Sequence, residues 1–184
     1  MATTTYVALL RGINLGRSRQ VAMADLRAVV AEIGHGDVRT HLRSGNVLLT
    51  ADARSSDALV APLEDALSAR FGFDARVVVR SRDELAAVVA SDPFAGVATD
   101  GARYLVTFLS EPAGHRLDDL DPDAYAPDAF RVRGREIYAW LPDGVTASRL
   151  DRTAWEQRLP GVTVTARNWN TVTRLLAMAD EPVG

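Results

Sequence analysis

The sequence predicts an α+β protein in which two ferredoxin-like (βαββαβ) lobes pack together, with an added C-terminal helix. Apolar residues follow strand and helix spacings in the order β-α-β-β-α-β over about the first 80 residues. The same order returns more loosely in the rest of the chain, without a repeat of residues. Ser81-Arg82-Asp83-Glu84 has the pattern of a capping box at the start of a helix. We therefore predict an N-terminal lobe at 1–81 and a C-terminal α+β lobe with a terminal helix at 82–184.

The first lobe begins with an almost continuous apolar run, Thr5–Leu10, which is typical of a strand buried on both faces. A polar, Gly-containing loop follows, and Ser44-Gly45-Asn46 predicts a tight turn between two later strands. Pro62 fits the second helix only in its first turn or with a kink. The other predicted elements are a helix at 23–33, strands at 38–42 and 47–50, a helix carrying Leu59, Leu63, Leu67 and Phe71, and a strand at 75–79.

The second lobe shows a weaker pattern. Gly114–Pro127 is an acidic, Pro-bearing connection in which we expect one short helix. Asn170 fits the N-cap of a last helix with an apolar stripe at Val172, Leu175, Leu176 and Ala179. The other predicted elements are a helix after Ser81, a strand at 104–109, a hairpin at 130–133 and 136–141, a helix at 148–159 and a strand at 162–166.

Composition excludes several classes of function. The chain has no Cys, and all 21 of its basic residues are Arg, so thiol and Lys-dependent chemistry are excluded. The net charge is −3, and nucleic-acid binding is therefore not expected. The longest apolar run is far shorter than the ~18 residues of a membrane span, and no signal peptide is visible, so we expect a cytoplasmic protein without a membrane partner. The three His residues lack metal-ligand spacing, and we expect no metal and no cofactor.

One edge of the first sheet is the strongest candidate for a site. In a split βαβ unit the third strand lies between the first two and antiparallel to both. The end of the first strand, the hairpin turn and the start of the first helix then meet at one rim. The polar residues placed there are Arg11, Asn14, Arg43, Ser44 and Asn46. They suit a carboxylate or phosphate, although Asn14, Ser44 and Asn46 are also ordinary turn and cap residues.

Several motifs resemble a known bacterial family, the domain of unknown function 1697. The resemblance covers nearly the whole chain and rests on Arg11-Gly12-Ile13-Asn14, Ser44-Gly45-Asn46 and, near the C-terminus, Arg167-Asn168-Trp169-Asn170-Thr171. It implies a two-lobed α+β fold but no reaction. It also adds Arg167 and Asn168 to the candidate ligand-binding residues. Arg167 either has a structural hydrogen-bonding role at the start of the last helix or faces the Arg11 rim, and Trp169 is expected to serve packing.

The sequence leaves two functions open. The first is binding of a small anionic ligand at the Arg/Asn/Ser rim. If the protein is an enzyme, catalysis would rest on positioning and charge stabilisation, because no nucleophile–base pair is visible. The alternative is a non-catalytic protein-interaction module in which these motifs are fold determinants. Side chains that hydrogen-bond to one another inside the fold would favour the alternative, and a concave Arg-lined pocket would favour a ligand site. The oligomeric state is not predicted.

Overall fold

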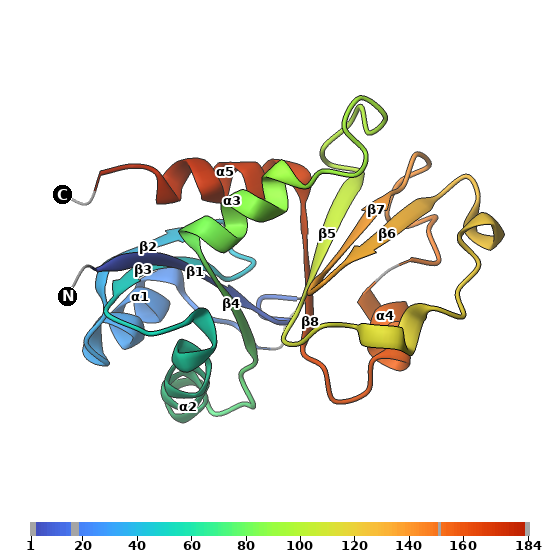
Figure 1. Cartoon of the computed structure of the whole chain (residues 1–184). Helices are drawn as coiled ribbons and strands as arrows, with labels where there is room; N and C mark the ends of the chain where they lie inside the picture. The colour runs from blue at the N-terminus through green and yellow to red at the C-terminus, as the bar shows by residue number, and fades with distance from the viewer. Residues whose placement is uncertain (1–2, 16–18, 151, 183–184) are drawn as a thin grey trace. The chain divides into compact units, whose positions relative to one another are not determined.

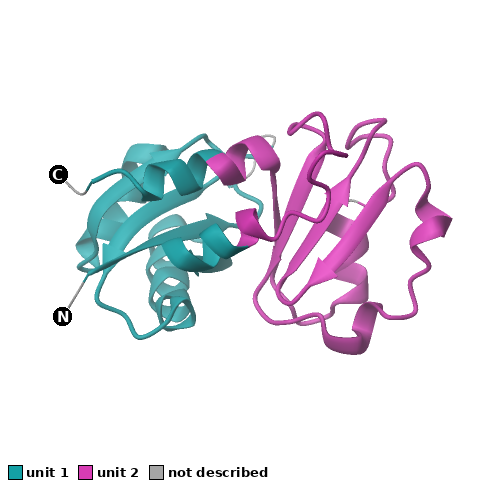
Figure 2. Cartoon of the chain, turned by 45° about the horizontal axis from the view of Figure 1, so that its top comes forward, with its two compact units in different colours: residues 1–87, 174–184 teal, residues 88–173 magenta. Residues whose placement is uncertain are grey.

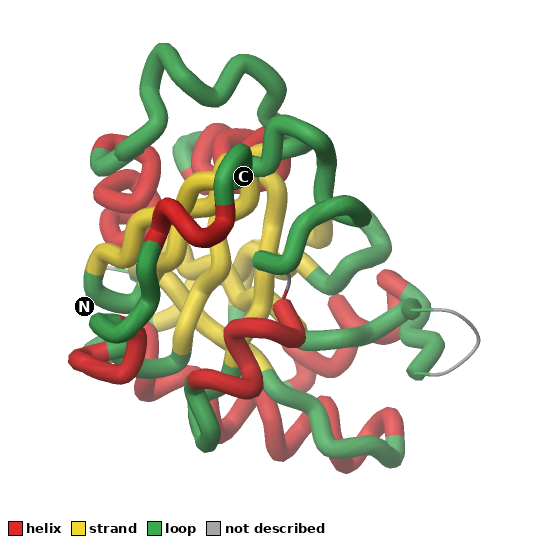
Figure 3. Tube along the Cα trace, turned by 90° about the vertical axis from the view of Figure 1, so that its right-hand side faces the viewer, coloured by secondary structure: helices red, strands yellow, loops and turns green. Residues whose placement is uncertain are grey.

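The computed structural model describes residues 3–15, 19–150 and 152–182, which form two four-stranded antiparallel sheets and five α-helices (Figure 1). The predicted α+β class is confirmed. Figure 3 traces these elements along the chain, with strands in yellow and helices in red. None of the helices among the described residues has the length and apolar character needed to cross a membrane.

The chain divides into two compact units, Met1–Ala87 with Arg174–Gly184, and Val88–Thr173 (Figure 2). These units differ from lobes at 1–81 and 82–184, because the end of the chain joins the first unit. There, Arg82 Nε lies 2.6 Å from Asp180 Oδ1, and Arg39 Nη1 lies 2.9 Å from Glu181 Oε2. Whether each predicted lobe is an independent domain stays a prediction.

The first unit has the element order β-α-β-β-α-β. Its elements are β1 (Thr4–Leu10), α1 (Met23–Glu32), β2 (Gly36–His41), β3 (Asn46–Ala51), a 3-10 helix (Ser56–Leu59), α2 (Val60–Phe71) and β4 (Val77–Ser81). The strand order is β2-β3-β1-β4, and β3 is antiparallel to both β1 and β2. This is the arrangement from which the sequence predicts that the ends of β1 and β2 lie at one edge of the sheet. The helices α1 and α2 cover one face of this sheet (Figure 1). The apolar core between them includes Leu10, Leu26, Leu49, Leu63 and Val79.

Two local predictions in the first unit are confirmed. Pro62 lies in the first turn of α2, where its missing N–H costs nothing. The helix α3 (Arg82–Ala90) starts with the predicted capping box. Ser81 N–H donates to Glu84 Oε2 at 2.7 Å, and Glu84 N–H donates to Ser81 Oγ at 3.1 Å. The box satisfies two backbone donors at the point where β4 turns directly into a helix.

The second unit has the strand order β6-β7-β5-β8. Its elements are β5 (Tyr104–Leu109), 3-10 helices at Gly114–Leu117 and Pro122–Tyr125, β6 (Ala129–Arg133), β7 (Glu136–Trp140), α4 (Arg152–Arg158), β8 (Val164–Asn168) and the start of α5 (Trp169–Ala179). Two 3-10 turns thus replace the predicted short helix between β5 and β6. Assignment of the two lobes to the ferredoxin-like class stays a prediction.

The predicted cap of the last helix is wrong by two residues. The side chain of Asn168, not Asn170, accepts the hydrogen bond from Thr171 N–H, at 2.9 Å. Both Asn residues precede the apolar stripe, and the choice depends on where β8 ends. Because β8 continues to Asn168 and α5 starts at Trp169, no loop remains in which Asn170 could act as the cap.

Candidate functional site

Asn14 joins two segments at the predicted rim. Its backbone has a φ of 55°, a left-handed conformation that Asn tolerates better than most residues. Its Nδ2 donates to the carbonyl oxygens of Val21 at 3.0 Å and Arg43 at 2.7 Å. Its Oδ1 accepts from Val21 N–H at 2.8 Å. The amide therefore ties the residues just before α1 to the hairpin turn after β2.

Asn46 organises that turn from inside. It is 0% exposed, and its Nδ2 donates to the carbonyl oxygen of His41 at 2.8 Å and to Ser44 Oγ at 3.1 Å. These bonds close the turn across residues 42–45 and give the buried amide nitrogen two acceptors within the protein. Ser44 itself is exposed at the tip.

Gly45 packs against the end of β1. Its carbonyl oxygen accepts from Leu10 N–H at 2.8 Å, and its φ is +79°. A Cβ at this position would lie 2.7 Å from Ile13 Cδ1 and 2.8 Å from Leu10 Cβ. The sequence prediction that the segment around Arg11–Asn14 meets the Ser44–Asn46 turn is therefore confirmed.

A depression of about 550 Å³ opens beside this turn. It is lined by Gln20, Val21, Ala22, Met23, Asp25 and Arg43. Of the predicted ligand-binding residues, only Arg43 appears in this lining. Ala22 occupies the N-cap of α1 and provides no side-chain cap, and the first bond of the helix is from Leu26 N–H to its carbonyl oxygen at 3.0 Å. Backbone N–H groups of an uncapped first turn favour negative charge.

Arg11 and Arg43 occupy different surroundings. Arg11 is half-buried, and its N–H donates to the carbonyl oxygen of Arg76 at 2.8 Å, which joins the end of β1 to the segment before β4. Arg43 is exposed. Within the described residues, the guanidinium of Arg43 has no hydrogen bond or ion pair. The exposed Arg43 guanidinium is therefore available to a ligand.

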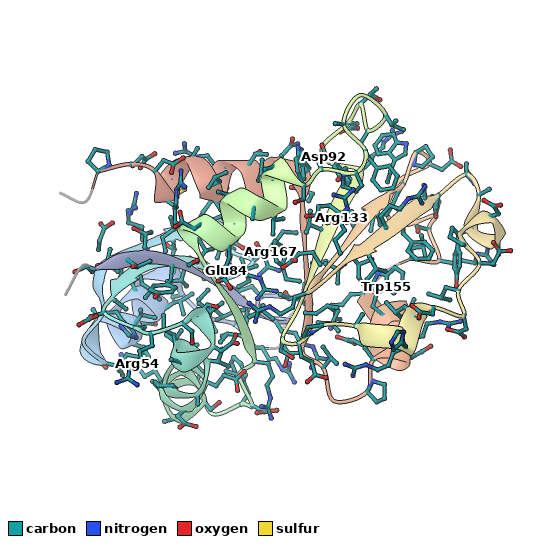
Figure 4. All side chains as sticks on the ribbon, in the orientation of Figure 1. Arg54, Glu84, Asp92, Arg133, Trp155 and Arg167 are labelled. Carbon is teal, nitrogen blue, oxygen red and sulfur yellow. The ribbon has the colours of Figure 1, made fainter. Side chains whose placement is uncertain are left out.

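The C-terminal candidates lie in the second unit and have structural partners there. Arg167, which is labelled in Figure 4, is buried. Its Nη1 donates to Thr165 Oγ1 and to the carbonyl oxygen of Ala166, both at 2.8 Å. Burial lowers the pKa of Arg167 to about 10, so its guanidinium stays protonated near neutral pH. Asn168 caps α5. Trp169 stacks on Tyr104 with ring centroids 4.8 Å apart, which agrees with its predicted packing role.

Sequence reasoning missed Gln20 and Asp25 as residues of the depression. The available signal was the absence of Ser, Thr, Asp or Asn at position 22, directly before the apolar stripe of α1. An uncapped helix start leaves backbone N–H groups without a side-chain acceptor, so the residues beside it are candidates for a ligand site.

The described residues contain no group of three or more His, Asp or Glu arranged to hold a metal ion.

Comparisons with known proteins give a family and a fold. The family described as protein of unknown function (DUF1697) matches residues 3–138, and the chain therefore belongs to this family. Among solved structures, the conserved bacterial protein SP0830 from Streptococcus pneumoniae is similar with a TM-score of 0.75 and 22% sequence identity. That match covers 98% of this chain and 100% of the other, and at this identity it supports the fold alone. No curated protein matches the sequence.

Proposed function

We propose that this DUF1697 protein binds a small anionic ligand, a carboxylate or a phosphate, in the depression beside the start of α1. The observation that carries the proposal is the state of Arg43. Its side chain lines the depression and, within the described parts of the chain, has no hydrogen-bond or ion-pair partner. A guanidinium presents several donors in a planar fork, which matches the oxygens of a carboxylate or phosphate.

The start of α1 adds to this attraction. Ala22 and Met23 line the same depression, and the N-cap residue Ala22 makes no side-chain cap hydrogen bond. An anion at this point would receive backbone N–H donors together with the Arg43 guanidinium. The volume of about 550 Å³ lies within the range of small-molecule sites, roughly 300–1,000 Å³.

The other predicted residues of the rim act on the ligand through Arg43. Asn14 bonds to the backbone of Arg43, and Asn46 closes the turn that carries it. Both amides are therefore positioning groups in this proposal. Arg11 and Ser44 remain predicted ligand neighbours, and the proposal does not depend on Arg167 or Asn168. If a reaction occurs, Arg43 would contribute positioning and charge stabilisation.

We also propose a cytoplasmic location, which the absence of Cys supports.

The alternative is a protein-interaction module in which the motifs hold the fold. It is favoured by the internal hydrogen bonds of Asn14, Asn46 and Asn168, each of which serves the backbone of its own unit. It differs from the ligand proposal in what Arg43 does. A fold determinant has partners within the protein, whereas the exposed Arg43 guanidinium has none among the described residues.

The test is a thermal-shift titration with inorganic phosphate and with propionate on the parent, Arg43→Gln and a matched control, Arg54→Gln. Arg54 is an exposed Arg outside the depression (Figure 4). A ligand at ~100 Kd adds about 2.7 kcal/mol to the folded state. We expect a shift in the parent and in Arg54→Gln that is lost in Arg43→Gln, with equal melting temperatures without ligand. Equal shifts in all three proteins, or none with either anion, would refute the proposal.

A further inference from the structure

The charges around the depression suggest what kind of ligand it selects. Its charged lining residues are Arg43 and Asp25, one of each sign. Both side chains are exposed, and neither has a hydrogen bond or ion pair within the described residues. Because the two do not neutralise each other in a direct ion pair, each remains available to a complementary group on a ligand.

We propose that the ligand is a zwitterion of the amino-acid type, with its carboxylate at Arg43 and its ammonium at Asp25. This inference rests on the proposed function and narrows its ligand class. A plain anion gains from Arg43 but is repelled by the Asp25 carboxylate. A ligand that carries an ammonium beside its carboxylate converts that repulsion into attraction.

The rest of the lining favours an apolar side chain on this ligand. Val21, Ala22 and Met23 form a continuous apolar segment of the lining, while Gln20 adds one amide. Val21 is 2% exposed, and Met23 is half-buried against the core. The apolar surface open at this segment comes from the exposed Ala22 and the half-buried Met23, and covering it with a branched aliphatic group is favourable in water. Leucine is therefore a suitable probe, since it carries a carboxylate, an ammonium and a branched aliphatic side chain.

Asp25 also has a simpler explanation. It lies in the first turn of α1, where a carboxylate is favoured by the helix dipole without any ligand. That role predicts a change in stability when Asp25 is neutralised but no change in the order of ligand affinities. The zwitterion proposal predicts a change in that order, so the two explanations are separated by comparing ligands within one variant.

The experiment is a ¹H–¹⁵N NMR titration of the full chain with four probes. They are L-leucine, 4-methylpentanoate (leucine without its ammonium), 3-methylbutylamine (leucine without its carboxylate) and inorganic phosphate. The proteins are the parent, Asp25→Asn, Arg43→Gln and the control Asp65→Asn, an exposed Asp of α2 outside the depression. The amide signals of residues 20–25 and 43 report on binding at the depression.

We expect leucine to bind the parent about two- to fivefold more tightly than 4-methylpentanoate, the size of effect typical for an exposed charge pair. Asp65→Asn should keep this preference and Asp25→Asn should abolish it, because 4-methylpentanoate gains affinity when the repelling charge is removed. Arg43→Gln should weaken binding of both carboxylates.

Two results would overturn the inference in different ways. If leucine and 4-methylpentanoate bind the parent equally, and Arg43→Gln weakens both, the zwitterion class is wrong and anion binding stands. If none of the four probes shifts these signals, or if 3-methylbutylamine binds as tightly as leucine while neither 4-methylpentanoate nor phosphate binds, Arg43 does not bind an anion, and the proposed function fails with the inference.

Discussion

Replacing Gly45 with alanine tests how tightly the turn that carries Arg43 is fixed against the first strand. A methyl group there would meet Ile13 Cδ1 at 2.7 Å and Leu10 Cβ at 2.8 Å, both closer than carbon atoms approach in folded proteins. Leu10 cannot move aside easily, because it is 2% exposed and its N–H is bonded to the Gly45 carbonyl oxygen. The φ of +79° adds a conformational cost for any residue with a Cβ.

The expected loss has two parts. A left-handed backbone costs an alanine roughly 1–2 kcal/mol. Overpacking of a tight contact adds roughly 1–3 kcal/mol. We therefore expect Gly45→Ala to lower the free energy of unfolding by about 2–5 kcal/mol. Gly72→Ala is the matched control, because Gly72 has a φ of +72° and no neighbouring heavy atom within 4 Å of the new Cβ. The conformational cost should be similar, and the packing cost absent.

Urea denaturation followed by far-UV circular dichroism gives the comparison. Both glycines lie in the first unit, so both report on the same structure. The reduction of unfolded-state entropy by the added methyl group is common to the two variants and cancels in their difference. We expect Gly45→Ala to be less stable than Gly72→Ala by about 1–3 kcal/mol. A difference below about 0.5 kcal/mol would show that the turn can move away from β1, and that Arg43 is not rigidly placed.

The remaining predictions concern single contacts. Asn14→Gly keeps the positive φ but removes three hydrogen bonds, and should cost about 1–3 kcal/mol in urea denaturation. It should also weaken phosphate binding in the thermal-shift assay. Asn168→Ala removes the cap of α5 and should cost about 1 kcal/mol, with a smaller loss for Asn170→Ala. Trp155, which is labelled in Figure 4, is 1% exposed, and its Nε1–H has no hydrogen-bond partner among the described residues. Trp155→Phe should therefore change stability by less than about 1 kcal/mol, because removal of the unsatisfied donor offsets lost packing. Burial lowers the pKa of His35 below its ordinary value of 6.5. Stability should fall as the pH drops from 6.5 towards that lower pKa, since the unfolded chain binds the proton first, and His35→Gln should reduce this slope in urea denaturation at different pH values.

The fold of the first unit is readable from its sequence because each element carries its own signal. Thr5–Leu10 is almost continuously apolar, α1 has a clear apolar stripe, and the capping box at Ser81 and Glu84 is local in sequence. The second unit is harder, since between β5 and β6 the chain makes two 3-10 turns, which have no lasting periodicity. The sequence also does not identify the N-cap of α5. Both Asn168 and Asn170 fit the preference of an N-cap for Asn, and only the register of β8 decides between them.

The candidate site also has one part that the sequence predicts and another that it does not. Strand topology was enough to bring the ends of β1 and β2 together, because pairing rules fix which ends meet. Strand topology does not predict which groups the side-chain amides of Asn14 and Asn46 bond to. Asn14 bonds to the carbonyl oxygen of Arg43, 29 residues away, and no sequence pattern encodes which backbone group an Asn side chain reaches. It also could not reveal the depression, since the surface between α1 and the turn depends on how closely both approach Asn14.

Asn14 shows why a motif can matter for binding without touching a ligand. Its Nδ2 donates to Val21 and to Arg43, and both of these residues line the depression. One amide therefore holds two walls of the site at a fixed separation. Asn46 fixes the turn that carries Arg43 from the buried side. If the guanidinium were on a mobile turn, a ligand would have to restrict the backbone as well as bind, which would cost roughly 1–2 kcal/mol for each residue ordered. The internal hydrogen bonds that support the fold-determinant alternative are thus also what a ligand site at Arg43 requires, and only the response of Arg43→Gln to added anions separates the two.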